Sequence, residues 1–460
     1  MMKRIYIILI CALSACSKGY LDVNQTNPNQ TTNPPINGLL SEVTYQTGVN
    51  VFNVSNITSY YVQQLASPNA SSSTDIYDDI DASSTWKNIY LTIEDIRQME
   101  ALAVTKNAYQ HMGVGQILEA YNMSMLIDLW GDAPYSQAWQ GATYLTPAYD
   151  QGAAIYDSCL LLIEKGIASL KQADPLITLD AENDLVHAGS AAGWIKTAYT
   201  LKARLLNRLS KQANYDPAAV LAALDSGYTS NSDDAAITRF ESLSLWNETA
   251  VGNASGNLDG WLSATFINAL NGTTYGIFDP RLPLITDTTR YGDYRGTVNG
   301  AGRVGSGTDK GQCYLSVNGF YSRSGAPLLL LTYAEARFIA AEAYYGIDQT
   351  KAYQAYLDGI SANMDKVGVS AANKATYLAQ LPAFSKGLIF KEKYVAMFLQ
   401  PECWTDARRY NYQYKDFALP ANALLTTFIR RVSYPASETS RNAANVPAVT
   451  SLADFLWWDN

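Results

Sequence analysis

Residues 331–346 read LTYAEARFIAAEAYYG, and this stretch decides the fold class. Its apolar and small side chains recur at helical spacing, and Gly346 stands where a helix C-cap is expected. A second helical pattern begins almost at once, from Thr350, so the two segments predict a helix–turn–helix hairpin. Alanine and glycine at such positions let helices approach closely, which favours a scaffold of stacked helix pairs.

The same periodicity recurs on both sides of this hairpin. Residues 155–170 place Ile155, Cys159 and Ile163 on one apolar stripe, and residues 194–209 do the same with Trp194 and Leu201. We expect Cys159 and the two tryptophans at helical positions, Trp194 and Trp404, to be buried core residues. No strand ladder emerges. The sequence therefore predicts an all-α fold of degenerate tetratricopeptide-like helix pairs, over about residues 37–228 and 329–400.

Residues 229–328 differ from the rest of the chain. They are rich in Gly, Asn, Ser and Thr, with segments such as NASGNLDG and VNGAGRVGSGTDKG. Long segments without helical pattern inside a compact protein are usually functional loops. We therefore expect an irregular, loop-rich half with little strand, packed against a right-handed helical scaffold and followed by a C-terminal part at 401–460.

The N-terminus has the form of a bacterial lipoprotein leader. Two basic residues, Lys3 and Arg4, precede a short apolar run, and LSAC follows at 13–16. This pattern predicts a signal peptide at 1–15, lipidation of Cys16, and a polar tether at 16–36. The alternative is an ordinary signal peptide that happens to contain a cysteine.

Composition narrows the class of ligand. The 460 residues carry a formal net charge of −9, which argues against nucleic acid as a partner. Aromatic residues make up 12% of the chain and charged residues only 16%. This balance suits a protein that binds neutral polar ligands. A large helical core also contains many aromatic residues, so composition alone does not distinguish the two.

Motifs for catalysis and for metal binding are missing. The only histidines, His111 and His187, have no ligand-like neighbours, so we expect no metal site and no cofactor. No nucleophile elbow or phosphate-binding loop occurs, and GAGRVGSG at 300–307 lacks the strand that a dinucleotide turn requires. A pair of carboxylates could still cleave a glycosidic bond, although no acid stands out. We therefore expect a protein that is not an enzyme.

Several stretches together resemble the SusD/RagB family, in particular its SusD-like branch. They are YLDVNQTNPN (20–29), DLWGDAPYSQAW (128–139), NDLVHAGSAAGWIKTAYTLKARLLNRLSK (183–211), FDPRLPLI (278–285), LTYAEARFIAAEAYY (331–345), FKEKYVAMFLQPECWTDARRYNY (390–412) and IRRVSYPASETSRNAANVP (429–447). The resemblance implies a lipoprotein of the outer membrane, facing the cell exterior, with one SusD-like domain over 37–460. It also implies a non-catalytic protein that captures oligosaccharides for a SusC-like TonB-dependent transporter.

The chain departs from the family pattern at two places. Ser17-Lys18-Gly19 replaces the acidic run that usually follows the lipidated cysteine. This difference concerns the expected display of the lipoprotein at the outer face of the membrane. GSAAGW at 189–194 stands where the family often has an acidic Gly-Asp turn.

The aromatic turn at 128–139 is expected to be structural, because relatives with different ligands share it. Trp130 continues an apolar helix face that Gly131 and Pro134 end, and we expect Trp130, Tyr135 and Trp139 to pack rather than to bind. Four arginines match the double-arginine motifs of the family. They are expected to bond carboxylates and carbonyls between the two halves: Arg408, Arg409, Arg430 and Arg431.

Ligand contacts are expected from the loops, where aromatic faces could stack on sugar rings and polar groups could bond their hydroxyls. Loop 67–85 offers Tyr77 with Asp75, Asp78 and Asp79. The irregular half offers Trp246, Trp261, Arg290, Tyr291, Asp293, Tyr294 and Tyr321.

The resulting hypothesis is a lipid-anchored glycan- or nutrient-binding subunit of an outer-membrane import complex. Two alternatives stay open: a lipoprotein glycoside hydrolase, and a helical-repeat adaptor that binds only protein. The nature of the ligand is open too, because members of the family also take peptides.

Overall fold

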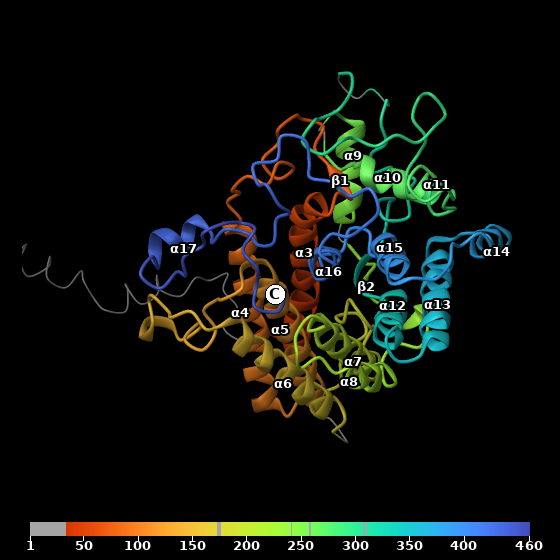
Figure 1. Cartoon of the computed structure of the whole chain (residues 1–460). Helices are drawn as coiled ribbons and strands as arrows, with labels where there is room; N and C mark the ends of the chain where they lie inside the picture. The colour runs from red at the N-terminus through yellow and green to blue at the C-terminus, as the bar shows by residue number, and fades with distance from the viewer. Residues whose placement is uncertain (1–33, 173–175, 241, 257–258, 307–308, 310) are drawn as a thin grey trace, which may run out of the picture.

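The computed structural model describes residues 34–460, except for 173–175, 241, 257–258, 307–308 and 310. The predicted signal peptide, Cys16 and nearly all of the tether lie outside the described residues. Within the described ranges, no helix is long and apolar enough to cross a membrane. The chain is mostly α-helical, which confirms the predicted fold class (Figure 1).

The N-terminal helices form one layer of the scaffold. They are α3 (Ile36–Tyr61), α4 (Ser83–Lys106), α5 (Tyr109–Trp130) and α6 (Gly152–Leu170). α5 contacts the other three, and its residues from Gly113 onward are buried on nearly every side. Small residues allow α5 and α6 to meet, since a Cβ at Gly113 would lie 2.8 Å from the Gly166 carbonyl oxygen.

The remaining helices complete the scaffold. They are α7 (Ala191–Arg208), α8 (Pro217–Leu224), α12 (Tyr333–Tyr344), α13 (Gln349–Val367), α14 (Ala371–Ala379), α15 (Lys386–Ala396) and α16 (Glu402–Arg409). α12 and α13 are the hairpin predicted from 331–346, and α7 with α8 forms a second pair. The expected glycine cap differs: Gly346 follows the end of α12 without a positive φ. The turn is closed instead by Asp348, whose carboxylate accepts from the first backbone nitrogens of α13.

The segment 229–328 is irregular but not without secondary structure. It contains α9 (Leu245–Ala254), α10 (Ala264–Leu270), α11 (Leu282–Ile285) and a 3₁₀ turn, Asn231–Asp233. Two short antiparallel pairs tie it to the scaffold: β1 (Leu65–Ala66) with β3 (Trp261–Leu262), and β2 (Ala235–Ile237) with β4 (Leu328–Leu331). Figure 1 shows α9, α10 and α11 at one end of the molecule and α6, α7 and α8 at the other.

The turn after α5 ends the helix and buries its aromatic residues, as expected. Gly131 takes a φ of +87°, and the Trp130 indole donates to the Ser433 carbonyl at 2.8 Å. Trp130 is fully buried, edge-on to Trp86 at 5.0 Å between ring centres. Tyr135 and Trp139 are half-buried; the phenol of Tyr135 donates to Glu119, and the indole of Trp139 donates to a backbone carbonyl.

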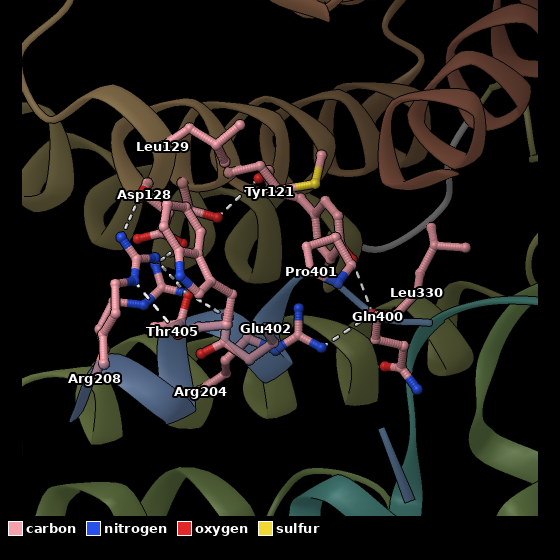
Figure 2. A pocket seen from close by; sticks show the side chains of 14 residues that line it. Tyr121, Asp128, Leu129, Arg204, Arg208, Leu330, Gln400, Pro401, Glu402 and Thr405 are labelled. Atoms are coloured by element: carbon pink, nitrogen blue, oxygen red, sulfur yellow. Dashed lines mark hydrogen bonds and ion pairs between the residues drawn. The ribbon is translucent and has the colours of Figure 1, made fainter. Parts of the chain in front are cut away.

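Three buried ion clusters join the helices. Figure 2 shows the first, the Asp128 cluster, where Arg208 of α7 lies between Asp128 of α5 and Glu402 of α16. The cavity there holds only about 10 Å³, the space of a single water. The three clusters consist of these residues: Asp128, Arg204, Arg208, Glu335, Glu402 and Arg408; Glu342, Lys393, Asp406 and Arg409; and Asp279, Arg281, Lys391 and Glu392.

The four motif arginines bond carboxylates and carbonyls, as expected, but within the helical scaffold and the C-terminal part. Arg408 donates to the Asp128 carbonyl at 2.7 Å, and Arg431 donates to the Trp130 carbonyl at 2.6 Å. Arg409 pairs with Glu342 and Asp406, and Arg430 pairs with Asp459. They therefore bind the C-terminal part to α5 and α12 rather than to the loop-rich half. Cys159, Trp194 and Trp404 are buried, as expected.

Candidate functional site

Half of the side chains expected to contact a ligand are buried. Trp246 and Tyr321 are 3% exposed, Trp261 and Tyr77 are 1% exposed, and Asp75 is fully buried. Burial of this extent keeps these five side chains from contacting a ligand at the surface. The loop-rich half needs a core of its own, and its largest rings supply it: Trp246 packs edge-on to Phe52 of α3 at 4.6 Å between ring centres.

Asp75 joins two loops that are distant in sequence. Its carboxylate accepts from the backbone nitrogens of Ser67 at 2.8 Å and Gly300 at 3.0 Å, and from the Asn299 amide at 2.7 Å. Burial raises the pKa of Asp75 to about 6. The backbone nitrogen of Ser71 also donates to the Gly300 carbonyl. Loop 67–82 and residues 299–303 therefore form one surface.

Gly300 permits a third segment to join this surface. Its φ is +78°, and a Cβ at this position would lie 1.8 Å from the Ala421 carbonyl oxygen. No side chain fits such an approach. Ala421 and Asn422 consequently lie against Asn299 and Gly300, to whose carbonyls they donate hydrogen bonds.

A polar pocket of about 170 Å³ opens where these segments meet α10. We name it the α10 pocket. Its lining comprises Gln63, Ala264, Thr265, Asn268, Thr274, Val298, Asn299, Lys415, Asp416, Ala418, Leu419 and Pro420.

Gln63, at the end of α3, holds the pocket walls together. Its amide nitrogen donates to the Ala418 carbonyl at 2.6 Å, and its amide oxygen accepts from the Thr265 hydroxyl at 2.5 Å. Its φ is +53°, and that of Asp416 across the pocket is +59°. Non-glycine residues rarely adopt these angles, and such strained positions cluster at binding sites.

Polar groups and apolar edges alternate around the α10 pocket. The Asp416 carboxylate and the Asn268 side-chain amide make no hydrogen bond or ion pair to any described residue. The Lys415 ammonium donates to the Thr274 carbonyl at 2.6 Å and keeps further donors. Val298 and Leu419 are 52% and 37% exposed at the rim. Such a combination suits a small ring with several hydroxyls.

A second feature of the loop-rich half is the exposed ring of Tyr291, which is 56% exposed. The guanidinium carbons of Arg290 and Arg295 lie 4.8 and 4.7 Å from its ring centre, and Arg295 pairs with Asp293 at 2.6 Å. Tyr294 is half-buried against Phe278. Four predicted residues, which are neighbours in the sequence, thus lie at or near the surface: Arg290, Tyr291, Asp293 and Tyr294.

The last predicted residue, Asp78, closes its own loop. Its carboxylate accepts from the Ser73 hydroxyl at 3.2 Å and from the Asp79 backbone nitrogen at 2.9 Å. Asp79 is exposed beside it.

Sequence reasoning missed the residues of the α10 pocket, above all Asn268, Lys415 and Asp416. The one available indication was the Lys-Asp pair at 415–416, placed between Tyr414 and Phe417 in an otherwise aromatic run. Nothing in the sequence indicates that this pair meets α10.

The described lining of the α10 pocket includes one acidic side chain, Asp416, and no histidine or cysteine. Among the described residues, no cluster of His, Cys, Asp and Glu could hold a metal ion. Both histidines lie in the helical half, where burial lowers the pKa of each to about 4. His111 lies 2.6 Å from the Asn37 side-chain oxygen, and His187 lies 2.5 Å from the Thr197 hydroxyl.

Comparisons with known proteins agree with this architecture. Residues 26–435 match the model of the SusD-like family described as "starch-binding associating with outer membrane". A search of curated protein sequences found no match. Among solved structures, a SusD/RagB family protein from Bacteroides thetaiotaomicron is 21% identical, with 93% of this chain and 99% of that chain covered and a TM-score of 0.76.

Two further structures extend the likeness. A chitin-binding SusD homologue from Flavobacterium johnsoniae is 20% identical, with 91% and 99% of the two chains covered and a TM-score of 0.77. A SusD homologue from Bacteroides fragilis is 20% identical, with 93% and 99% covered and a TM-score of 0.76. At such identities the likeness establishes the fold. Since the family match spans nearly the whole chain, this protein belongs to the SusD-like family of outer-membrane-associated proteins.

Proposed function

We propose that this protein is a lipid-anchored, non-catalytic subunit that binds oligosaccharides and passes them to a SusC-like TonB-dependent transporter. The α10 pocket carries the proposal, because unpaired carboxylate and amide groups face a small space with apolar edges. The chitin-binding relative from Flavobacterium johnsoniae supports a glycan as the ligand class. Residues 37–460 would form the single binding body, and Cys16 would hold it on the outer face of the outer membrane.

The mechanism follows from the groups in the pocket. One sugar ring would enter between α10 and residues 415–420, with hydroxyls bonded to Asp416, Asn268 and Lys415. Further rings would extend over the loop surface toward exposed aromatic residues such as Tyr291. Binding is expected to be modest, since an open polar site retains much of its desolvation cost.

Titration calorimetry with neutral oligosaccharides tests this function. Maltohexaose and chitin hexamer are suitable probes, compared between the wild type and Asp416→Ala. Asp157→Ala is the matched control, because Asp157 is an exposed acid on α6 far from the pocket. We expect Asp416→Ala to weaken binding at least tenfold and Asp157→Ala to leave it unchanged. Equal affinities for all three proteins would remove the pocket from the proposal.

Product analysis after incubation with the same oligosaccharides separates the non-catalytic function from the hydrolase alternative. We expect no shorter products. If products appear and one Asp or Glu substitution abolishes them, the protein is a glycosidase.

The anchor and the transporter need tests of their own. Labelled palmitate should attach to the wild type and not to Cys16→Ser in the native host. Affinity purification from outer membranes should recover a TonB-dependent transporter together with the wild type. Recovery of other proteins alone, with no response to glycans, would favour the adaptor alternative.

A further inference from the structure

A second and larger groove lies on another face of the molecule. It runs between the first turns of α4 and the short helix α17 (Ala436–Arg441) and encloses about 480 Å³. Figure 1 shows α17 at the left edge of the molecule, away from α10 at the top. We name it the α4–α17 groove; no part of the α10 pocket contributes to it.

The floor of the α4–α17 groove is aromatic and fixed in position. Trp86 and Tyr90 lie one turn apart on α4, with ring centres 5.1 Å apart and a 38° angle between the planes. The Tyr90 hydroxyl donates to the Pro134 carbonyl at 2.7 Å, and Trp139 packs on the Tyr90 ring at 5.2 Å. The groove floor is thus the outer edge of the aromatic packing behind the turn at 128–139. Trp86 is only 4% exposed, so the groove reaches mainly the half-buried ring of Tyr90 and the side chain of Leu91, which is 51% exposed. A ligand would meet these side chains without any need to reorganise the aromatic packing behind them.

The walls of the groove carry two cations without partners. Lys87 of α4 and Arg441 of α17 are exposed, and neither side chain has a hydrogen bond or ion pair with any described residue. Glu438 also lines the groove, but its carboxylate accepts from the Tyr149 hydroxyl at 2.9 Å and lies 3.4 Å from the Asn442 amide. With the Glu438 carboxylate counted, the charged side chains of the groove sum to +1, on a protein of net charge −9, and so favour anions locally.

We propose that the α4–α17 groove is a second saccharide site, specific for acidic oligosaccharides that carry carboxylate or sulfate groups. A sugar ring lies over the exposed parts of Tyr90 and Leu91, and an acidic substituent is held between Lys87 and Arg441. This site goes beyond the proposed function, because the α10 pocket is matched to neutral hydroxyls. It would let one molecule retain two chemically different segments of a branched or decorated glycan.

Calorimetry with the mature chain tests the groove. The probes are a galacturonic acid hexamer, a sulfated oligosaccharide and neutral maltohexaose, each at low and high salt. The double variant Lys87→Gln/Arg441→Gln is compared with Lys106→Gln/Lys386→Gln, which removes the same net charge from exposed sites outside the groove. Thermal melting of both variants checks that the fold is intact.

We expect at least one acidic probe to bind the wild type and to weaken as salt rises. The groove variant should lose at least tenfold in affinity for that probe, and the control variant less than twofold. Asp416→Ala should leave acidic binding unchanged, so failure of this site and failure of the α10 pocket give different results. No binding of either acidic probe, equal loss in both double variants, or loss in Asp416→Ala would overturn the proposal.

Discussion

The backbone nitrogen of Gly300 donates to the carboxylate of Asp75 at 3.0 Å, across 225 residues of sequence. The same carboxylate oxygen accepts from the Ser67 nitrogen, so a single buried side chain fixes two loops. The loop surface around the α10 pocket is therefore organised by the protein itself, before any ligand arrives.

Substitution of Asp75 should loosen this surface. In Asp75→Asn, the side-chain oxygen can still accept from the backbone nitrogens of Ser67 and Gly300. The new side-chain nitrogen then faces the Asn299 amide nitrogen, which is also a donor. A buried donor without an acceptor costs about 1–3 kcal/mol. Urea unfolding should show a loss of stability of this order together with weaker glycan binding. Asp79→Asn, at an exposed neighbour, should change neither.

The ionisation of Asp75 gives this region a pH dependence. Burial raises its pKa from 3.8 to about 6, so the folded protein binds the proton more tightly than the unfolded chain does. Its contribution to stability is therefore most favourable below pH 3.8 and declines as pH rises through 6. The wild type minus Asp75→Asn difference in unfolding free energy should fall over this window. A flat or rising difference would contradict the assignment.

A methyl group at Gly300 should separate the loops. Gly300 and Gly276 have nearly equal φ, +78° and +76°, but a Cβ at Gly276 has no atom within 4 Å. Gly276→Ala therefore carries backbone strain alone, whereas Gly300→Ala adds a clash with the Ala421 carbonyl. We expect a larger drop in melting temperature and a loss of glycan affinity only for Gly300→Ala. Similar melting temperatures would show that residues 415–424 move aside at little cost.

The Asp279 cluster should contribute to acid unfolding. Burial by itself would raise the pKa of Asp279, but Arg281 and Lys391 outweigh burial and lower the pKa to about 2. This stabilisation is fully present above the unfolded value of 3.8 and is lost as pH falls toward 2. Arg281→Met leaves the acids of the cluster undercompensated, which costs about 3–5 kcal/mol at neutral pH. Arg239→Met, at an exposed pair with Glu182, should cost less than about 1 kcal/mol in the same denaturation assay.

Substitution of an exposed aromatic residue should weaken glycan binding, whereas substitution of a buried one should lower stability. Tyr291→Ala removes an exposed ring, so it should weaken glycan binding and leave the melting temperature unchanged. Trp261→Ala removes a ring that is 1% exposed and should cost about 3–5 kcal/mol of stability. Calorimetry and denaturation of both variants check the pair. A strong loss of stability in Tyr291→Ala would place its ring in a structural role.

Helix periodicity predicted the scaffold because the relevant interactions are local. The hairpin at 331–367 and the helix end at Gly131 both follow from patterns within a few turns of the chain. Trp130 was correctly expected in the core since it continues the apolar face of α5.

The loop residues were harder to predict, because composition does not say which ring a loop buries. Trp261 and Tyr291 both lie in the loop-rich half, yet the strand of Trp261 pairs with β1 and its ring packs against Tyr314 at 5.7 Å between ring centres. The α10 pocket depends on Gln63, Asn268 and Asp416, which come from three distant segments. Tertiary contacts bring these segments together, above all the hydrogen bonds of Gln63 with Thr265 and Ala418.

The three buried ion clusters contribute nothing to the net charge of the protein. In each cluster the acids and bases are equal in number: three and three, two and two, and two and two. The net charge of −9 therefore belongs entirely to residues outside the clusters. Substitutions of exposed residues can consequently adapt this protein to higher or lower salt concentrations, or to a new glycan. The buried ion clusters that join the helices stay unchanged.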